Sequence, residues 1–109
     1  MIRVLLDENL PRKLKWTIEA EVLTVPERGW SGVKNGKLLR MAAEEFDVFI
    51  TMDQGIEYQQ NLNALDLCIV LLSAVSNDID DLLPLAPQIN QCFSEAAPGI
   101  VIRIFENRS

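Results

Sequence analysis

The chain has 109 residues, of which 49 % are hydrophobic and 24 % are charged, and its formal net charge is −6. This length suits one domain, predicted over residues 1–109, and the apolar content is too high for a disordered chain. Because the chain contains no histidine, Ser-His-Asp catalysis, Cys-His catalysis and His-ligated zinc are excluded.

The first half of the chain alternates short apolar runs with segments of helical spacing. The run at 2–6 is rich in β-branched residues and predicts a buried strand, and Pro11 suits the opening turn of the segment that follows. Trp16 lies within that segment and is expected to pack against the core. The predicted elements are a strand at 2–6, a helix at 10–18, a strand at 21–25, a loop at 26–34, a helix N-capped by Asn35 and a strand at 48–51.

The second half continues the same alternation. The run LCIVLL at 67–72 is the most hydrophobic and predicts a central strand. Two prolines, Pro84 and Pro87, make one straight helix over 78–96 unlikely to form, so we expect a restart near Pro84. The predicted elements are a strand at 67–72, a helix capped by Asn77, a second helix from about 84, a turn at 98–99 and an edge strand at 100–105.

Strands that alternate with helices at this spacing predict an α/β fold. We expect a three-layer α/β/α sandwich with a mainly parallel five-stranded sheet. Right-handed crossovers place the carboxyl ends of parallel strands on one rim, where ligands of such sheets bind. Cys68 and Cys92 both lie among apolar residues and are expected to be buried, reduced thiols.

Acidic residues follow two of the predicted strands. The stretch LLDENLP places Asp7 and Glu8 after the first strand, and FITMD places Asp53 after the third. If these two strands are neighbours, Asp7 and Asp53 can share one cation, and an oxygen-rich site without histidine suits Mg²⁺ or Mn²⁺. The alternative is that these acids only cap the helix and the turn that follow them.

Other polar residues are expected on the same rim. Asn9, Asn35 and Ser73 are candidate lining residues, because each follows a strand or opens a helix there. Residues 1–46 hold 8 Lys and Arg against 7 Asp and Glu, whereas residues 47–109 hold 2 against 9. Two interpretations of the basic residues stay open, ordinary solvation of helices and a basic rim for a phosphate backbone. The candidate RNA-binding residues are Arg12, Lys13, Lys37 and the aromatic Tyr58.

Three motifs together suggest a family. VLLDENLPRKL, GWSGVKNGKLLRMAAEE and DVFITMDQG resemble a bacterial PIN-like family of unknown function that is related to the PIN-domain ribonucleases. The resemblance covers the chain from Ile2 to about Asn61 and implies a PIN-like fold whose acids bind Mg²⁺ or Mn²⁺ for RNA hydrolysis. It implies catalytic roles for Asp7, Glu8 and Asp53, with Asp7 and Asp53 as metal ligands. Related proteins often act as toxins that a partner protein neutralises.

The sequence departs from that family at one site position. An acid usually precedes the second helix, but Asn35 stands there, which removes one negative charge. Asp78 is the nearest candidate for the further acid expected after the fourth strand. An inactive PIN-like module that binds RNA or a protein therefore stays open beside an active ribonuclease.

A receiver-like phosphoacceptor domain is a third interpretation. LLDEN, TMD and LLSA mimic its motifs, but IRIFENRS supplies neither the lysine after the last strand nor a further helix. The expected partners are RNA and an antitoxin-like protein, with a homodimer as a further expectation. No apolar run is long enough to cross a membrane and no signal-peptide pattern opens the chain, so a cytoplasmic location is expected.

Overall fold

The computed structural model describes residues 1–106, so the end of the predicted domain and of the IRIFENRS segment lies outside the described part. Five strands form one sheet in the order β2-β1-β3-β4-β5, and every neighbouring pair is parallel. This confirms the predicted α/β fold with a five-stranded parallel sheet. The strands are β1 (Arg3–Leu6), β2 (Glu21–Thr24), β3 (Val48–Thr51), β4 (Cys68–Ser73) and β5 (Val101–Phe105).

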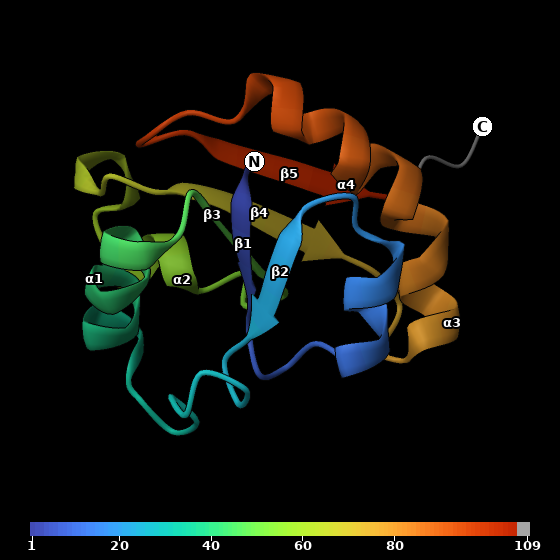
Figure 1. Cartoon of the computed structure of the whole chain (residues 1–109), viewed down its shortest axis with the longest axis horizontal. Helices are drawn as coiled ribbons and strands as arrows, with labels where there is room; N and C mark the ends of the chain where they lie inside the picture. The colour runs from blue at the N-terminus through green and yellow to red at the C-terminus, as the bar shows by residue number, and fades with distance from the viewer. Residues whose placement is uncertain (107–109) are drawn as a thin grey trace.

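Helical segments connect the strands, and several of them are short. The α-helices are α1 (Asn35–Glu45), α2 (Ile56–Gln59), α3 (Ile79–Leu82) and α4 (Ala86–Cys92). The 3-10 helices are η1 (Arg12–Thr17), η2 (Leu62–Ala64), η3 (Leu83–Leu85) and η4 (Phe93–Glu95). Figure 1 shows α1 and α2 on one side of the sheet and η1, α3 and α4 on the other.

Each face of the sheet has its own hydrophobic core, because successive strand side chains point to opposite faces. On β1, Leu5 faces the cluster beneath α1 and α2, whereas Val4 and Leu6 face the cluster beneath η1, α3 and α4. β3 is the middle strand and is buried along its whole length. The prediction that 67–72 is the central strand was wrong by one place, since strand order follows the crossovers and not hydrophobicity alone.

Several local predictions need correction. The helix predicted at 10–18 is a 3-10 helix, and Trp16 is 74 % exposed instead of packed against the core. Asn35 does not cap α1, because Lys34 is the N-cap residue and Asn35 is the first helical residue. Asn77 likewise precedes the N-cap residue of α3, which is Asp78. Both asparagine side chains bond elsewhere on the carboxyl-end rim.

Other predictions of local structure are confirmed. Pro84 lies in η3 and Pro87 in the first turn of α4, where a missing N–H leaves no helical bond unmade. Gly99 has a φ of 79°, and a Cβ there would lie 2.8 Å from the carbonyl oxygen of Asn63, so the turn before β5 requires glycine. Cys68 and Cys92 are buried free thiols. Within residues 1–106, no helix has the length and apolar character needed to span a membrane.

Candidate functional site

The pairing of β1 with β3 brings the two predicted acids to one rim. Leu6 pairs with Ile50, and the Asp7 N–H donates to the Ile50 carbonyl at 2.9 Å. Asp7 therefore continues β1 beside Thr51, and Asp53 follows two residues further along the chain. The two carboxylates also interact electrostatically, since Asp53 contributes to raising the pKa of Asp7.

Thr51 links the polar groups of this rim. Its buried hydroxyl donates to Asp7 Oδ2 at 2.6 Å. The Thr51 hydroxyl oxygen accepts hydrogen bonds from the Asp53 backbone N–H at 3.0 Å and from the Asn9 side-chain amide at 3.4 Å. One hydroxyl thus fixes the positions of an acid from β1, the loop after it and the loop after β3.

Asp7 is a buried carboxyl group, with 7 % of its surface exposed. Burial raises its pKa above the usual value of 3.8, and hydrogen bonds from the Thr51 hydroxyl and the Glu8 N–H oppose this effect. The negative charges of Glu8 and Asp53 raise the pKa further. Within residues 1–106, no Lys or Arg forms a salt bridge with Asp7, so the structure places acidic charge here without a compensating cation.

Asp53 is held by its own turn and by α1. Its Oδ1 accepts the Gly55 N–H at 3.0 Å, which closes a turn before α2. Its Oδ2 accepts the side-chain amide of Asn35 at 3.0 Å. Asn35, which stands where the resembling family usually has an acid, therefore acts as a neutral donor that orients Asp53 instead of adding charge.

Asn9 leaves a buried oxygen without a partner. Its Nδ2 donates to Thr51, but its Oδ1 is the one buried side-chain oxygen or nitrogen atom within residues 1–106 that lacks a hydrogen-bond partner. Asn77 holds this segment from the other side by donating from its Nδ2 to the Asn9 carbonyl at 3.1 Å. An unsatisfied buried acceptor costs free energy, so an electropositive ligand at this position would be stabilising.

Glu8 and Ser73 lie on the same rim but away from this network. Glu8 is exposed, and its carboxylate accepts the Gly32 N–H at 3.3 Å, so it faces the loop between β2 and α1. Ser73 is exposed at the end of β4 and has no hydrogen bond to Asp7 or Asp53. The structure brings Asp7, Asn9, Asn35 and Asp53 together and leaves Glu8 and Ser73 at the periphery.

The predicted RNA-binding residues are exposed but lie on different elements. Arg12 and Lys13 line an open groove of about 800 Å³ between η1 and the start of α3, together with Asn77. Arg12 also contacts Glu27 at 3.5 Å, whereas no salt bridge involves Lys13 within residues 1–106. Tyr58 on α2 is 87 % exposed.

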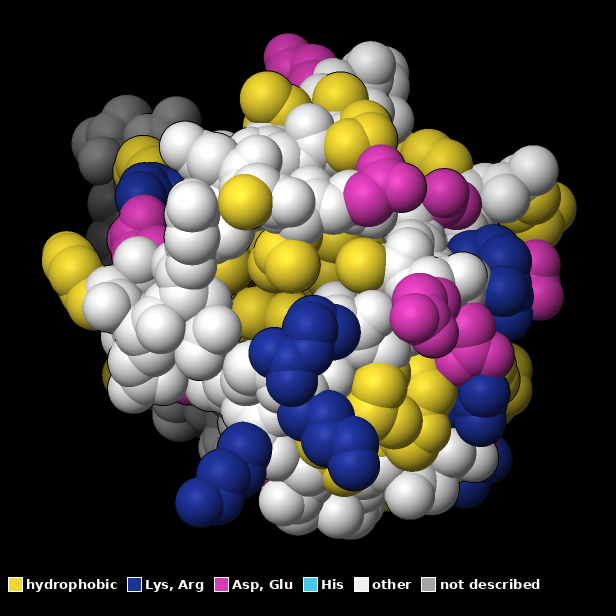
Figure 2. Space-filling model, turned by 90° about the vertical axis from the view of Figure 1, so that its left-hand side faces the viewer, with side chains coloured by type: hydrophobic (Ala, Val, Ile, Leu, Met, Phe, Trp, Pro, Cys, Tyr) yellow, Lys and Arg dark blue, Asp and Glu magenta, His cyan; other side chains and the backbone are white. Residues whose placement is uncertain are grey.

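Lys37 belongs to a basic row on α1. Lys34, Lys37 and Arg40 are all exposed and recur every three residues, a spacing that places them on one side of the helix. Figure 2 shows Lys and Arg side chains gathered over the lower part of this face, beneath an apolar hollow. Local positive charge therefore exists on a chain whose net charge is −6.

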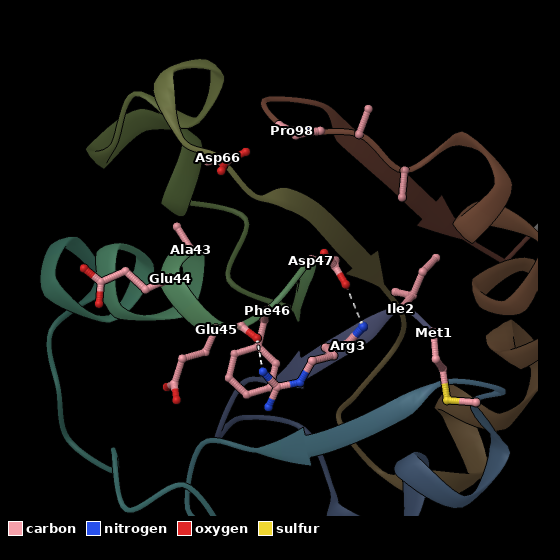
Figure 3. A pocket seen from close by; sticks show the side chains of 12 residues that line it. Met1, Ile2, Arg3, Ala43, Glu44, Glu45, Phe46, Asp47, Asp66 and Pro98 are labelled. Carbon is pink, nitrogen blue, oxygen red and sulfur yellow. Dashed lines mark hydrogen bonds between the residues drawn. The ribbon is translucent and has the colours of Figure 1, made fainter.

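A cavity of about 580 Å³ lies at the opposite, amino-terminal end of the strands. Figure 3 shows Arg3 in its lining together with the acids Glu44, Glu45, Asp47 and Asp66. The Arg3 N–H donates to Asp47 Oδ2 at 2.8 Å, and its guanidinium donates to the Glu45 carbonyl at 2.5 Å. The guanidinium also lies 5.0 Å from the centre of the Phe46 ring. These contacts give the backbone N–H and the guanidinium of Arg3 partners within the protein, so Arg3 is not left free to bind a ligand in this cavity.

The oxygen atoms of the carboxyl-end rim are of the type that binds a hard cation, but they are few. Asp7 and Asp53 offer two carboxylates and Asn9 offers an unpaired amide oxygen, which are ligand types that Mg²⁺ and Mn²⁺ accept together with water. Over residues 1–106, however, no group of three or more Asp, Glu, Cys or His residues could hold a metal ion. Any cation here would therefore be bound by few protein ligands.

Thr51 and Asn77 connect the polar groups of this rim and were not among the predicted site residues. Thr51 is the polar end of an otherwise apolar strand, two residues before Asp53, and this alternation could have indicated that both side chains serve the same rim. No local signal relates Asn77 to Asn9, because that contact joins residues 68 positions apart.

No family model matches the chain, and no curated protein or solved structure does either. The class that the described structure supports is an α/β fold with an all-parallel five-stranded sheet and a polar, acidic carboxyl-end rim.

Proposed function

We propose that this protein is a PIN-like ribonuclease, a three-layer α/β/α domain that hydrolyses RNA phosphodiester bonds with the help of Mg²⁺ or Mn²⁺. One observation carries the proposal. Asp7 and Asp53, from two neighbouring strands, converge through Thr51 on a rim that has no compensating cation within the described residues. A site that concentrates negative charge at a stability cost is typical of cation binding.

Each residue has a defined role in this proposal. Asp7 and Asp53 would hold the cation, and the Asn9 amide oxygen would be a third ligand. Thr51 orients Asp7 by donating a hydrogen bond, and Asn35 orients Asp53 in the same way. A bound divalent ion supplies Lewis acidity and an activated water for attack on phosphorus. Glu8, exposed beside the rim, would serve there as a proton acceptor.

The charges around the rim suit a phosphate backbone. Arg12 and Lys13 line the groove on one side, and Lys37 belongs to the basic row on α1. Cations on both sides of an acidic centre allow an extended strand to bind across it. Tyr58 offers an exposed aromatic face for stacking one base. Single-stranded RNA is the substrate class that uses both features.

A second candidate function is binding without cleavage. The amide of Asn35 occupies one Asp53 oxygen at 3.0 Å, and no third acid joins the pair within residues 1–106. A site with this charge holds a cation weakly. The same fold would then serve as a module that binds RNA or an antitoxin-like protein.

The deciding experiment incubates purified protein with mixed single-stranded RNA oligonucleotides in Mg²⁺ or Mn²⁺. We expect cleavage that EDTA stops and that Asp7→Asn removes. Asp66→Asn is the matched control, because Asp66 is an exposed acid at the opposite end of the strands. Cleavage that survives both EDTA and the Asp7→Asn change would come from a contaminant, and EDTA-sensitive cleavage that persists in Asp7→Asn would remove Asp7 from the proposed site. Absence of cleavage in every metal, with RNA still bound, would support the second candidate function.

A further inference from the structure

β2 and β5 form the two edges of the sheet (Figure 1), and their backbone N–H and C=O groups are satisfied differently. On β2, alternate residues bond to β1, as the Glu21 N–H does to the Ile2 carbonyl. The outward-facing Thr24 is satisfied by its own turn, because its N–H donates to Glu27 Oε1 at 3.1 Å and its carbonyl accepts the Arg28 N–H at 3.0 Å. This edge leaves little backbone for another strand to pair with.

On β5, among the residues that the structure describes, the outward-facing backbone groups are open except for the Phe105 carbonyl, which accepts one side-chain hydrogen bond. The Ile69 N–H donates to the Ile100 carbonyl at 2.9 Å, so the even-numbered residues of this strand pair with β4. Val101, Arg103 and Phe105 therefore direct their N–H and C=O groups away from the sheet. One hydrogen bond reaches them within residues 1–106, from Gln88 Nε2 to the Phe105 carbonyl at 3.2 Å.

The side chains along β5 do little to protect this edge. Arg103 is its one charged residue, and its guanidinium is paired with Glu57 at 2.5 Å. Phe105 is 58 % exposed and Ile100 is 43 % exposed. A groove of about 240 Å³ runs between α4 and β5, so α4 does not seal the edge. Sheet edges of this kind pair with additional strands unless charge, proline or a covering element prevents it.

We propose that β5 pairs antiparallel with β5 of a second copy of this chain, which joins two sheets into one ten-stranded sheet. A two-fold axis makes the interface self-complementary, because each copy offers the same backbone groups. This inference does not depend on the proposed nuclease activity.

Like-charge repulsion excludes one register, and we propose another. Placing Arg103 opposite Arg103 of the second copy would set like charges side by side, which is destabilising. A register centred on Ile104 instead places Arg103 opposite Phe105 of the second copy. Both side chains then lie on the same face of the joined sheet, and the aliphatic part of Arg103 can pack on the exposed ring while its guanidinium keeps its ion pair with Glu57. The N–H and C=O groups of residues 103 and 105 form the central hydrogen bonds.

The test is the mass in solution of the whole chain, measured by sedimentation and light scattering from about 1 µM to about 1 mM. We expect the wild type to approach twice the chain mass of 12.3 kDa as concentration rises, since one strand per copy makes a small, weak interface. Arg103→Pro removes an outward N–H that the sheet itself does not use, and should leave a monomer. A wild type that stays monomeric over this range overturns the proposal.

Val22→Pro is the matched control, because Val22 faces outward on the β2 edge and its change should not affect association. Phe105→Lys tests the same edge without a backbone change, by placing a second cation opposite Arg103. This variant should be monomeric, and its exposed position favours normal folding, which circular dichroism checks. Dimers that persist in both Arg103→Pro and Phe105→Lys, or that dissociate equally in Val22→Pro, would overturn the pairing.

Discussion

The charged side chains at the two ends of the parallel sheet differ in the partners that surround them. At the amino end, Arg3 is surrounded by acceptors, with Asp47, the Glu45 carbonyl and the Phe46 ring all in contact with it. At the carboxyl end, Asp7 is buried beside Asp53 and relies on a hydroxyl and an N–H for its hydrogen bonds. At the amino end the charge of Arg3 is met by nearby acceptors, whereas at the carboxyl end Asp7 and Asp53 accept hydrogen bonds from neutral donors within the described residues.

This difference in electrostatics identifies the candidate site. The groove beside the carboxyl-end rim, at about 800 Å³, is larger than the amino-end cavity of about 580 Å³. In the amino-end cavity, the polar groups that Arg3 contacts already have partners. The carboxyl end combines a raised pKa on Asp7 with an unpaired acceptor on Asn9. A carboxyl group with a raised pKa beside an unpaired buried acceptor, both at a strand-end rim, is an indication of ligand binding.

Neutralising either carboxylate of the carboxyl-end rim should give the largest effect and tests the contrast between the two ends of the sheet directly. If Asp7 and Asp53 hold a divalent cation together, Asp7→Asn and Asp53→Asn should each weaken Mn²⁺ binding by at least about 100-fold, roughly 2.7 kcal/mol. Calorimetric titration with Mn²⁺ measures this, with Asp66→Asn at the amino end as the control. Equal heats from wild type and Asp53→Asn would mean that Asp53 only closes the turn before α2.

Adding an acid tests the same site in the opposite direction. Asn35→Asp removes the amide that donates to Asp53 and adds a carboxylate in its place. We expect Mn²⁺ affinity to rise by about 10-fold, or roughly 1.4 kcal/mol, because the cation then gains another charged ligand. In the absence of metal, the variant should be less stable, because two carboxylates then face each other. Unchanged calorimetric affinity would show that residue 35 lies outside the cation's reach.

The parts of this site that local sequence patterns determine could be predicted, and the parts that depend on contacts between distant residues could not. Strand periodicity and strand-end acids are local patterns, so the sheet and the shared rim of Asp7 and Asp53 could be predicted. The roles of Asn35 and Asn77 could not, because their side chains bond across the fold instead of capping the helices beside them. Cap preferences are weak free energies that long-range hydrogen bonds can override.

Neutralising charge at the amino end should have the opposite effect on folding from neutralising it at the carboxyl end. Arg3→Met keeps an apolar stem but removes the contacts to the Glu45 carbonyl, Glu21 and the Phe46 ring. We expect the free energy of unfolding to fall by roughly 1–2 kcal/mol, discounted because the side chain is 40 % exposed. Urea unfolding measures the change, and Lys13→Met is the exposed control. An unchanged midpoint would mean that the amino end gains no stability from these contacts.

The smallest predicted effect is the pH dependence of folding that Asp7 creates. Burial raises the folded-state pKa of Asp7 above 3.8, so the unfolded chain loses this proton at a lower pH than the folded chain does. As pH rises from that unfolded value through the folded pKa, the folded state binds more protons and this group makes folding progressively less favourable. The destabilisation is complete above the folded pKa and absent well below 3.8.

Asp7→Asn removes this titration while leaving an amide oxygen that can accept from Thr51. The variant should therefore be more stable than the wild type at neutral pH, and the two stabilities should converge in acid. Urea unfolding from about pH 3 to about pH 8, without metal, measures the difference, with Asp66→Asn expected to follow the wild type. Saturating Mn²⁺ should narrow the gap at neutral pH, since the cation stabilises only the ionised Asp7. A variant that is less stable at every pH would show that the Asp7 carboxylate is a structural group, and the contrast between the two ends would then fail.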